Sequence, residues 1–414
     1  MFKYICIILA VLIGEAVAKS MFPVPRLPGA CSQMTVRRDV VTLAPAELQR
    51  FIRVVREMHR RGWMDGFGSM HDHISHQIHG NEQFFAWHRR FLRHFELLMQ
   101  EIDPEAVLPY WNWGTYWNNP LADPVLSAAY FGGNGRPGDN CVLDGAQARW
   151  GRNYPTRNCL TRRYRYGTNT GSFWPMRAVR DVMNSARTHA QFRSRIENGA
   201  HGIVHLGLGG DFETMYAPVD VLFFLHHATI DKVWAEWQSR DPLRYRSVDG
   251  YDSLRAPVTV NSPMPFYGEE VGSALATNGP GYCYVYDDVP AAPSSAFFKS
   301  RRATFSALNA LVNITSAAPA SPGEQQRPER SETAAEATAE ETQAEAAEEA
   351  AEFYARHFNA TRDFKPPSPM GTQWLKGRHM DVAEAARMQA VVNRVVAQIN
   401  IERRQQQEEL GADS

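Results

Sequence analysis

The sequence predicts a mainly α-helical protein with a helix-bundle core, long loops and few short strands. Two observations lead to this prediction. Apolar residues recur at helical spacing in several separate segments of the chain. In addition, ten of the 14 histidines lie in two short segments, 71–94 and 201–227, which we expect to be largely helical. Hydrophobic residues make up 44% of the chain, enough for a sizeable buried core around these helices.

The helical pattern can be followed along the chain. It begins in residues 45–62, with apolar positions at Leu48, Phe51, Ile52, Val55 and Met58. A second helix is predicted for 83–102 and ends at Asp103-Pro104. The aromatic stretch LPYWNWGTYW (108–117) is expected to be buried. Residues 118–172 are rich in Gly, Asn, Pro and Arg and predict a long loop region. Further helices are predicted for 175–198, 201–208 and 219–239, and loops with small strands for 241–300.

The N-terminus has the pattern of a secretory signal peptide. Lys3 precedes an apolar run, Tyr4–Ile13, and Ala16-Val17-Ala18 fits a cleavage site. We therefore expect a signal peptide over 1–18 and a secreted, extracellular chain that begins near Lys19. The apolar run is too short for a membrane anchor, and no other segment is long and apolar enough, so no membrane partner is expected. The formal net charge of -1 gives no indication of a nucleic-acid partner.

Four cysteines remain after Cys6 leaves with the signal peptide. An even number of cysteines in a secreted chain predicts disulfides, and four cysteines allow three connectivities. We favour Cys141 with Cys159, which flank a short loop, and therefore Cys31 with Cys283. Two N-glycosylation sequons begin at Asn313 and Asn359.

The histidines indicate metal binding. His201 and His205 are four residues apart, so on a helix both imidazoles leave the same face. Only one residue of the pair His226-His227 can face the same ion. Such a spacing also occurs by chance on solvated helices, but VLFFLHHATI is otherwise apolar. Imidazole suits zinc, copper, iron and nickel, and the absence of cysteine from both segments favours copper.

The first segment offers a similar set. His88 lies in an apolar helix start, where an unpaired histidine would be costly, and His79 lies nine residues before it. The third ligand could be His71, His73 or His76. His94 is expected to be solvent-exposed or to support a ligand, and His59 to lie at the surface.

Five stretches of this sequence resemble the type-3 copper proteins, which are the tyrosinases, catechol oxidases and haemocyanins. They are GWMDGFGSMHDHI, HGNEQFFAWHRRFLRHFE, LPYWNW, HGIVHLGLGG and DVLFFLHHATIDKVWAEWQ, within residues 40–290. The secreted animal tyrosinases are the most similar. The resemblance implies a dinuclear copper site in the helix-bundle core, with two copper ions per chain. It assigns the ligands position by position, as His71, His79 and His88 for one ion and His201, His205 and His227 for the other.

The resemblance also implies an enzyme, a tyrosinase-like oxidoreductase that uses O2 to oxidise phenols and catechols to o-quinones. Such chemistry would serve pigment formation or the cross-linking of cuticle, shell or eggshell. Glu197 resembles the carboxylate that orients the water used as base, and Gly202 occupies a position where asparagine accompanies strong monophenol hydroxylation. Diphenol oxidation is therefore the expected activity, with monophenol hydroxylation open. The alternative is a non-catalytic or oxygen-binding structural relative; a two-zinc hydrolase lacks a carboxylate ligand.

The C-terminal part changes in composition. We expect the copper domain to span 19–315, an acidic Ala/Glu-rich linker 316–352 and a helical tail 353–414. Apolar residues line one side of a helix predicted for 381–409, which could contact the chain's own core or a partner. In this family a C-terminal extension often covers the copper entrance, which makes FYARHF (353–358) a candidate plug. The alternative is a tail that only aids solubility or assembly.

Overall fold

The computed structural model describes residues 22–293 and 363–412. Within them the α-helices are α2 (Pro45–Arg60), α3 (Trp63–His73), α4 (Ser75–Ile78), α5 (Phe84–Ile102), α6 (Met176–Ser185), α7 (His189–Ile196), α8 (Gly202–Leu208), α9 (Leu222–Ser239), α12 (Thr372–Gly377) and α13 (Val382–Ala412). A π-helical turn, η4 (Glu197–His201), joins α7 to α8. The strands are β1 (Thr35–Arg37), β2 (Gly151–Arg152), β3 (Asn158–Cys159) and β4 (Tyr284–Tyr286). The prediction of a mainly helical fold with few short strands is confirmed.

Short 3-10 segments make many of the connections between these elements. They are η1 (Val40–Thr42), η2 (Pro120–Ala122), η3 (Pro124–Leu126), η5 (Gly210–Glu213), η6 (Ala217–Val219), η7 (Pro242–Arg246) and η8 (Val271–Ala274). Residues 118–172 are otherwise almost without regular structure, as predicted.

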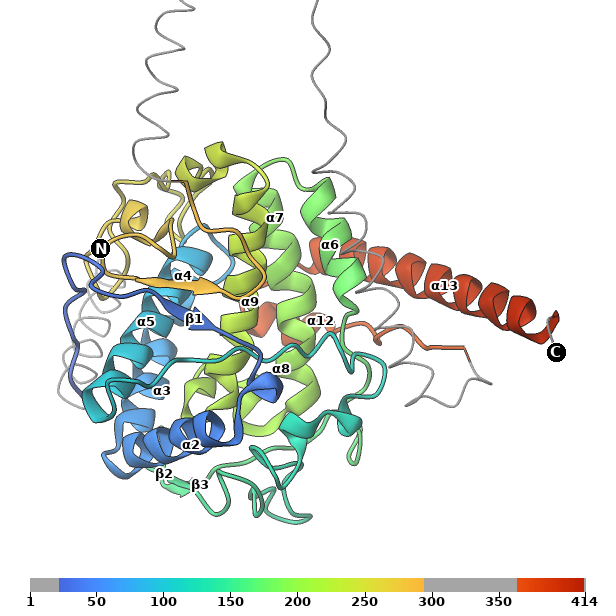
Figure 1. Ribbon diagram of the computed structural model, residues 1–414, viewed down its shortest axis with the longest axis horizontal. Coiled ribbons are helices and arrows are strands. Elements are labelled where there is room, and N and C mark those ends of the chain that lie inside the picture. Colours follow the sequence, from blue (N-terminus) through green and yellow to red (C-terminus); the bar gives the residue numbers. More distant parts are fainter. Residues whose placement is uncertain (1–21, 294–362, 413–414) are drawn as a thin grey trace, which may run out of the picture. The chain divides into compact units, whose positions relative to one another are not determined.

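Helices α5 and α9 form the centre of the core (Figure 1). Helix α9 is buried on every side over most of its length, because apolar residues surround it rather than forming a stripe. The rings of Phe95 and Phe224 stack with their centroids 3.7 Å apart where the two helices meet. This pairing matters for function, because α5 carries His88 and α9 carries His226 and His227.

A buried polar network fixes α9 relative to its neighbours. Asp231, on α9, accepts hydrogen bonds from Arg89 of α5 at 2.6 Å and from the Tyr286 hydroxyl of β4 at 2.7 Å. The Tyr284 hydroxyl and the Arg37 guanidinium also contact the same carboxylate. A buried carboxylate with this many partners is fully compensated, so it can hold two helices and a strand in one register.

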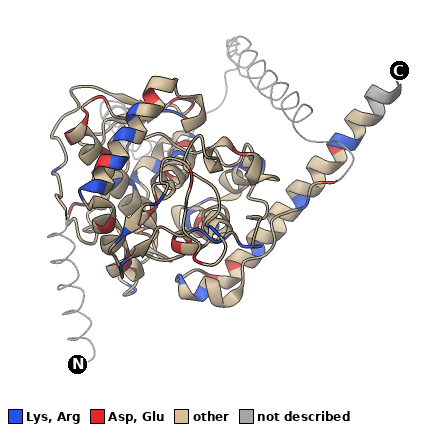
Figure 2. Cartoon of the chain, turned by 90° about the horizontal axis from the view of Figure 1, so that it is seen from below, with Lys and Arg blue, Asp and Glu red and all other residues tan. Residues whose placement is uncertain are grey.

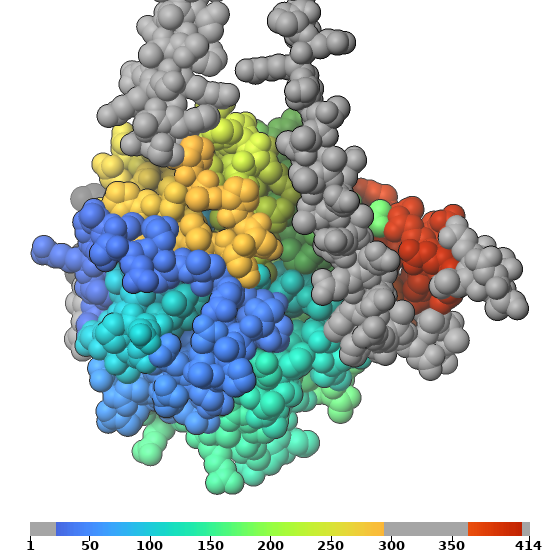
Figure 3. Space-filling model, viewed as in Figure 1, coloured from blue at the N-terminus to red at the C-terminus, as the bar shows by residue number. Residues whose placement is uncertain are grey.

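Both predicted disulfides are present. Cys31–Cys283 lies beside the parallel pair β1–β4, in which Thr35 is opposite Tyr284. The two ends of the core domain therefore lie side by side, as the blue and orange regions of Figure 3 show. Cys141–Cys159 closes the loop that contains the antiparallel pair β2–β3.

The structure differs from the sequence prediction in two helical regions. The helix predicted over 175–198 is divided, because α6 ends at Ser185 and the Thr188 side chain caps the start of α7. Helix α3 was not predicted and contains Gly66 and Gly68, which have low helix propensity. A Cβ on Gly66 would lie 2.3 Å from the Phe22 ring, and one on Gly68 would lie 2.6 Å from Val219. These glycines allow close packing of α3, which explains their presence in a helix.

The C-terminal segment from Lys365 onwards groups with the core domain. Helix α13 packs against α6, α7 and η4, and its C-terminal half runs past them (Figure 1). Its buried side chains share one face: Ala385, Met388, Val392, Val395 and Val396. Over the described part of the chain, lysines and arginines are interspersed with acidic residues (Figure 2).

Several predicted features lie outside the described residues: the signal peptide, both sequons, the acidic linker and the segment FYARHF. Among the residues that are described, no helix is long and apolar enough to cross a membrane.

Candidate metal centre

Three histidines of the first segment meet in the core. His71 lies on α3, His79 directly follows α4, and His88 lies on the first turns of α5. All three are almost fully buried. Each ring is held through Nδ1 by a backbone carbonyl: that of Met215 for His71, Ser75 for His79 and Phe84 for His88. The Nε2 atoms of His71 and His88 lie 3.3 Å apart.

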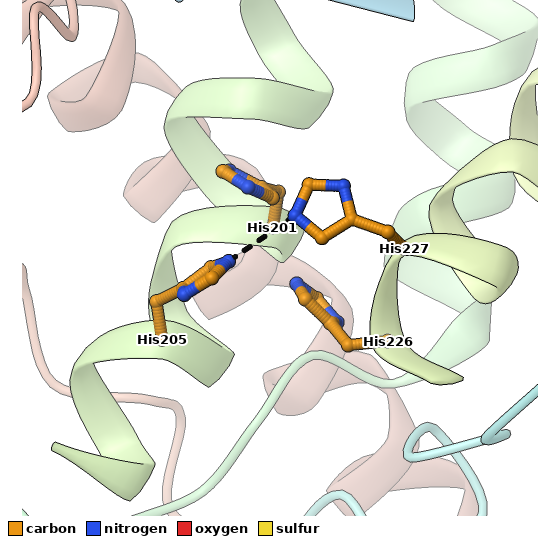
Figure 4. A group of neighbouring side chains, drawn as sticks. All are labelled: His201, His205, His226 and His227. Carbon is orange, nitrogen blue, oxygen red and sulfur yellow. Dashed lines mark hydrogen bonds between the residues drawn. The ribbon is translucent and has the colours of Figure 1, made fainter. Parts of the chain in front are cut away.

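The second cluster combines η4, α8 and α9 (Figure 4). Nδ1 of His201 donates to the Glu197 carbonyl at 3.2 Å, and Nδ1 of His205 donates to the Phe212 carbonyl at 2.7 Å. The Nε2 atoms of His205 and His227 lie 3.4 Å apart. The ligand atoms of the whole group, His226 included, lie within 4.8 Å of one another. The five-residue π-helical turn places His201 at its end, next to the start of α8.

The two clusters fit metal ions. In five of the six predicted ligands an Nδ1–H bonded to a carbonyl leaves the Nε2 lone pair free, which is the arrangement that supporting groups give to metal-binding histidines. Burial lowers the pKa of all six imidazoles, so the rings are neutral, and facing lone pairs repel unless a cation lies between them. Neither group contains a cysteine or a carboxylate. Neutral imidazole shells of this kind suit copper.

The two clusters also face each other. The His88 and His227 rings stack with their centroids 4.5 Å apart. The rings of His79 and His201 lie 6.4 Å apart, and both line the same small cavity. Two ions held by these sets would therefore be neighbours, as in a dinuclear centre.

The pair on α9 is divided by its surroundings. His227 lies between the two clusters, where its ring stacks on His88 at 4.5 Å and on Phe223 at 4.0 Å. His226 lies against the rings of His201 and His205, with centroids 5.5 Å and 5.0 Å away, and beside Trp113 and Phe212. The contact of His227 with rings of both clusters is what favours it as the ligand, with His226 as a supporting ring.

The other candidate histidines remain outside the clusters. His73 bonds back to the Ser69 carbonyl at 2.7 Å, and His76 is partly exposed. His94 is fully buried, where it contacts the Tyr267 hydroxyl and the Pro23 carbonyl, so the prediction that it could be solvent-exposed is wrong. His59 stacks on Trp150.

Glu197 lies beside both clusters, because it contacts the residue after His79 and its own carbonyl holds His201. Its buried carboxylate accepts a hydrogen bond from the backbone N–H of Gly80, the residue after His79, at 2.8 Å. Its other oxygen accepts from Arg193 at 2.9 Å. Burial raises the pKa of Glu197 to about 7, although Arg193 and the Gly80 amide oppose the shift.

The C-terminal segment supplies residues that sequence reasoning missed. A cavity of about 20 Å³ is lined by His71, His79, His201, His205, Glu213, Thr214 and Met215, and also by Trp374, Arg378 and Met380. Space of this size holds about one water molecule. The sequence suggested FYARHF as a plug because that segment is aromatic. Of the three C-terminal residues that line the cavity, only Trp374 is aromatic and could have been found by the same argument.

Comparisons with known proteins agree with the geometry. A family model for the common central domain of tyrosinase matches residues 56–240. A tyrosinase of Streptomyces antibioticus is 34% identical over 236 residues, covering 50% of this chain and 85% of the relative. Grixazone synthase of Streptomyces griseus is 29% identical over 262 residues, covering 50% and 85%. The fold matches a polyphenol oxidase of Thermothelomyces thermophila with a TM-score of 0.54 at 20% identity, covering 67% of this chain and 97% of that one.

A relative of this identity and coverage, together with two facing histidine clusters, shows that this chain belongs to the tyrosinase family of type-3 copper proteins, which hold two copper ions and act on phenols with O2.

Proposed function

We propose that this chain is a secreted oxidase that converts catechols to o-quinones, hydroxylates monophenols less well, and is closed by its own C-terminal segment. The observation that carries this proposal is the pair of facing histidine clusters, whose free Nε2 atoms fit two neighbouring copper ions. Copper, when bound there, would supply the binding of O2 and the acceptance of electrons from the phenol.

The chain's residues hold the centre and keep it dry. His71, His79 and His88 would bind one ion, and His201, His205 and His227 the other. The Phe84 ring lies 4.7 Å from the His88 ring and 5.0 Å from the His201 ring, and Phe223 covers His227. Apolar walls of this kind exclude water, so that a bound phenol is the group that reaches the centre.

Glu197 is the group we propose for handling the phenolic proton. A general base works best when its pKa lies near the working pH, and the pKa of this buried carboxyl is raised to about 7. Its Gly80 partner places it against the first cluster, and its own backbone carbonyl holds His201. Gly202 has no side chain that could hold a water beside Glu197, which is why we expect monophenols to react more slowly than catechols.

The C-terminal segment would prevent substrate from entering. The remaining cavity of about 20 Å³ is far smaller than the roughly 150 Å³ apolar cavity that is known to hold a benzene ring. The C-terminal segment packs closely against two glycines that directly follow predicted ligands. A Cβ on Gly80 would lie 2.2 Å from the His379 carbonyl oxygen, and one on Gly202 would lie 2.9 Å from Met370 Sδ. The segment therefore occupies the space above both histidine clusters.

Polar contacts hold the segment in place on both sides of the cavity. Arg378 donates to the Glu213 carbonyl, and the Asp381 backbone N–H donates to the Asn198 side chain at 2.6 Å. Arg165 donates to the Pro369 carbonyl at 2.5 Å. Leu375 and Met380 are buried beneath these contacts, so the closed arrangement combines apolar burial with directional hydrogen bonds.

The test compares residues 19–414 with residues 19–320 at equal copper content. We expect two coppers in each chain, faster turnover of DOPA than of tyrosine, and higher catechol turnover in the shorter chain. Two coppers with an absorption change on adding O2 to the reduced protein, but no turnover in either chain, would favour the oxygen-binding alternative. Equal catechol turnover in the two chains would contradict closure by the C-terminal segment but would leave the proposed oxidase activity standing. Secretion is tested separately by expressing the full chain 1–414, and a secreted product that does not begin near Lys19 would contradict the predicted signal peptide.

A further inference from the structure

Methionine side chains are concentrated at the opening of the metal centre. Met370 and Met380 both lie over Gly202: their Sδ atoms are 2.9 Å and 3.4 Å from the point that a Cβ on Gly202 would occupy. Met215 lines the same cavity as Met380. Apolar side chains such as leucine would close the cavity equally well. Closure therefore does not explain why these residues are methionines, whose distinguishing group is the thioether sulfur.

The methionines form a path from the surface towards the histidines. Met370 is partly exposed, whereas Met380 is buried. Met380 lines the cavity together with His201 and His205, and Gly202 directly follows His201. A metal ion that enters from outside would therefore meet Met370 first, then Met380, and then the imidazoles.

The chemistry of these groups is selective. Thioether sulfur is a soft donor that favours Cu(I), whereas zinc, magnesium and calcium prefer other ligands. Trp374 packs with Met370 against the cluster that contains Met380, and an indole face attracts cations. Two thioethers offer an ion fewer ligands than the three predicted imidazoles of either cluster, which suits a site that must release its ion to the histidines.

We propose that Met370 and Met380 form a Cu(I)-receiving site that passes copper to the histidine clusters while the C-terminal segment is docked. The transfer is a ligand exchange from thioether to imidazole, without a change in oxidation state. The segment would then serve metal loading as well as closure. This inference rests on the proposed function, because it needs a copper centre to receive the ion.

The first experiment detects the site itself. The chain 19–414 is labelled with ¹³C at the methionine methyl groups, and Ag(I) is added as a redox-inert probe for Cu(I). We expect Ag(I) to shift the Met370 and Met380 methyl signals and to leave that of Met388 unchanged, since Met388 is buried in α13 and does not line the cavity. Unshifted Met370 and Met380 signals would overturn the proposal.

The second experiment measures copper uptake by the copper-free chain from a Cu(I)–chelator complex. The double variant Met370→Leu/Met380→Leu preserves apolar volume, so the fold and closure should persist. We expect it to take up copper about tenfold more slowly, if the loss of the thioethers weakens the first capture of the ion as much as the loss of a supporting group weakens metal affinity. The matched control Met388→Leu should load at the parent rate. Two coppers bound at the parent rate in the double variant would refute the relay but keep the oxidase, whereas failure of the parent to bind two coppers would refute the proposed function itself.

Discussion

Closure of the site can be tested by one substitution in the full chain, Arg378→Ala. The Arg378 guanidinium donates through Nε and Nη2 to the Glu213 carbonyl and lies 4.8 Å from the centre of the Trp374 ring. Both of its neighbours line the cavity above the histidines. Removing the side chain therefore weakens the closed state without touching any predicted copper ligand.

The magnitude follows from these contacts. Hydrogen bonds that involve a charged group contribute about 1.5–3 kcal/mol, and Arg378 is only partly buried, so we take the lower end. A change of about 1.4 kcal/mol shifts an equilibrium between closed and open forms about tenfold. If the parent chain is mostly closed, catechol turnover should rise about tenfold, up to the ceiling set by the chain 19–320.

The assay is the initial rate of DOPA oxidation at equal copper content. Arg387→Ala is the matched control, because Arg387 lies in the same segment, is largely exposed and pairs with Glu384 within α13. Exposed pairs of this kind are worth well under about 1 kcal/mol, so the control should keep the parent rate. An Arg378→Ala chain as slow as the parent, beside a fast 19–320 chain, would show that the contacts at the cavity do not hold the tail closed.

Three further predictions concern the centre and the fold. His227→Ala should leave about one copper per chain and abolish oxidation, while His226→Ala should retain more copper; metal analysis showing the reverse order would exchange their roles. In the chain 19–320, Gly202→Asn should raise the ratio of tyrosine to DOPA turnover, and an unchanged ratio would remove this position from proton handling. Burial raises the pKa of Asp123, whose carboxylate accepts from Trp111, to about 7. Between about pH 4 and pH 7, the Asp123 carboxyl is protonated in the folded state but ionised in the unfolded state. Its contribution to the free energy of unfolding is therefore fully present below about pH 4 and is lost as the pH rises to about 7, by up to about 1.4 kcal/mol per pKa unit. Urea unfolding of Asp123→Asn should show a flatter pH dependence over that window, and an unchanged slope would contradict the assignment.

Local features were predicted well because their causes are local. Helical spacing of apolar residues located α2, α5 and α9 to within a few residues, since a helix that packs on a core must place its apolar side chains on the core side. The break between α6 and α7 depends on the cap at Thr188 and was missed. Helix α3 was missed because its glycines disfavour a helix locally, and only close packing against Phe22 and Val219 explains them.

The sequence by itself determined the type of chemistry: two groups of imidazoles without cysteine, at spacings that resemble one copper family, and two disulfide pairs. Spacing within the first segment left His71, His73 and His76 open, and the family resemblance selected His71; the packing of α3 brings His71 to the Met215 carbonyl, 144 residues away. The sequence could not show that Glu197 lies against Gly80, or that Arg378 and Met380 line the cavity. Only the tertiary structure decided these points, since contacts between distant segments depend on the packing of the whole core and leave no periodic signal in the chain.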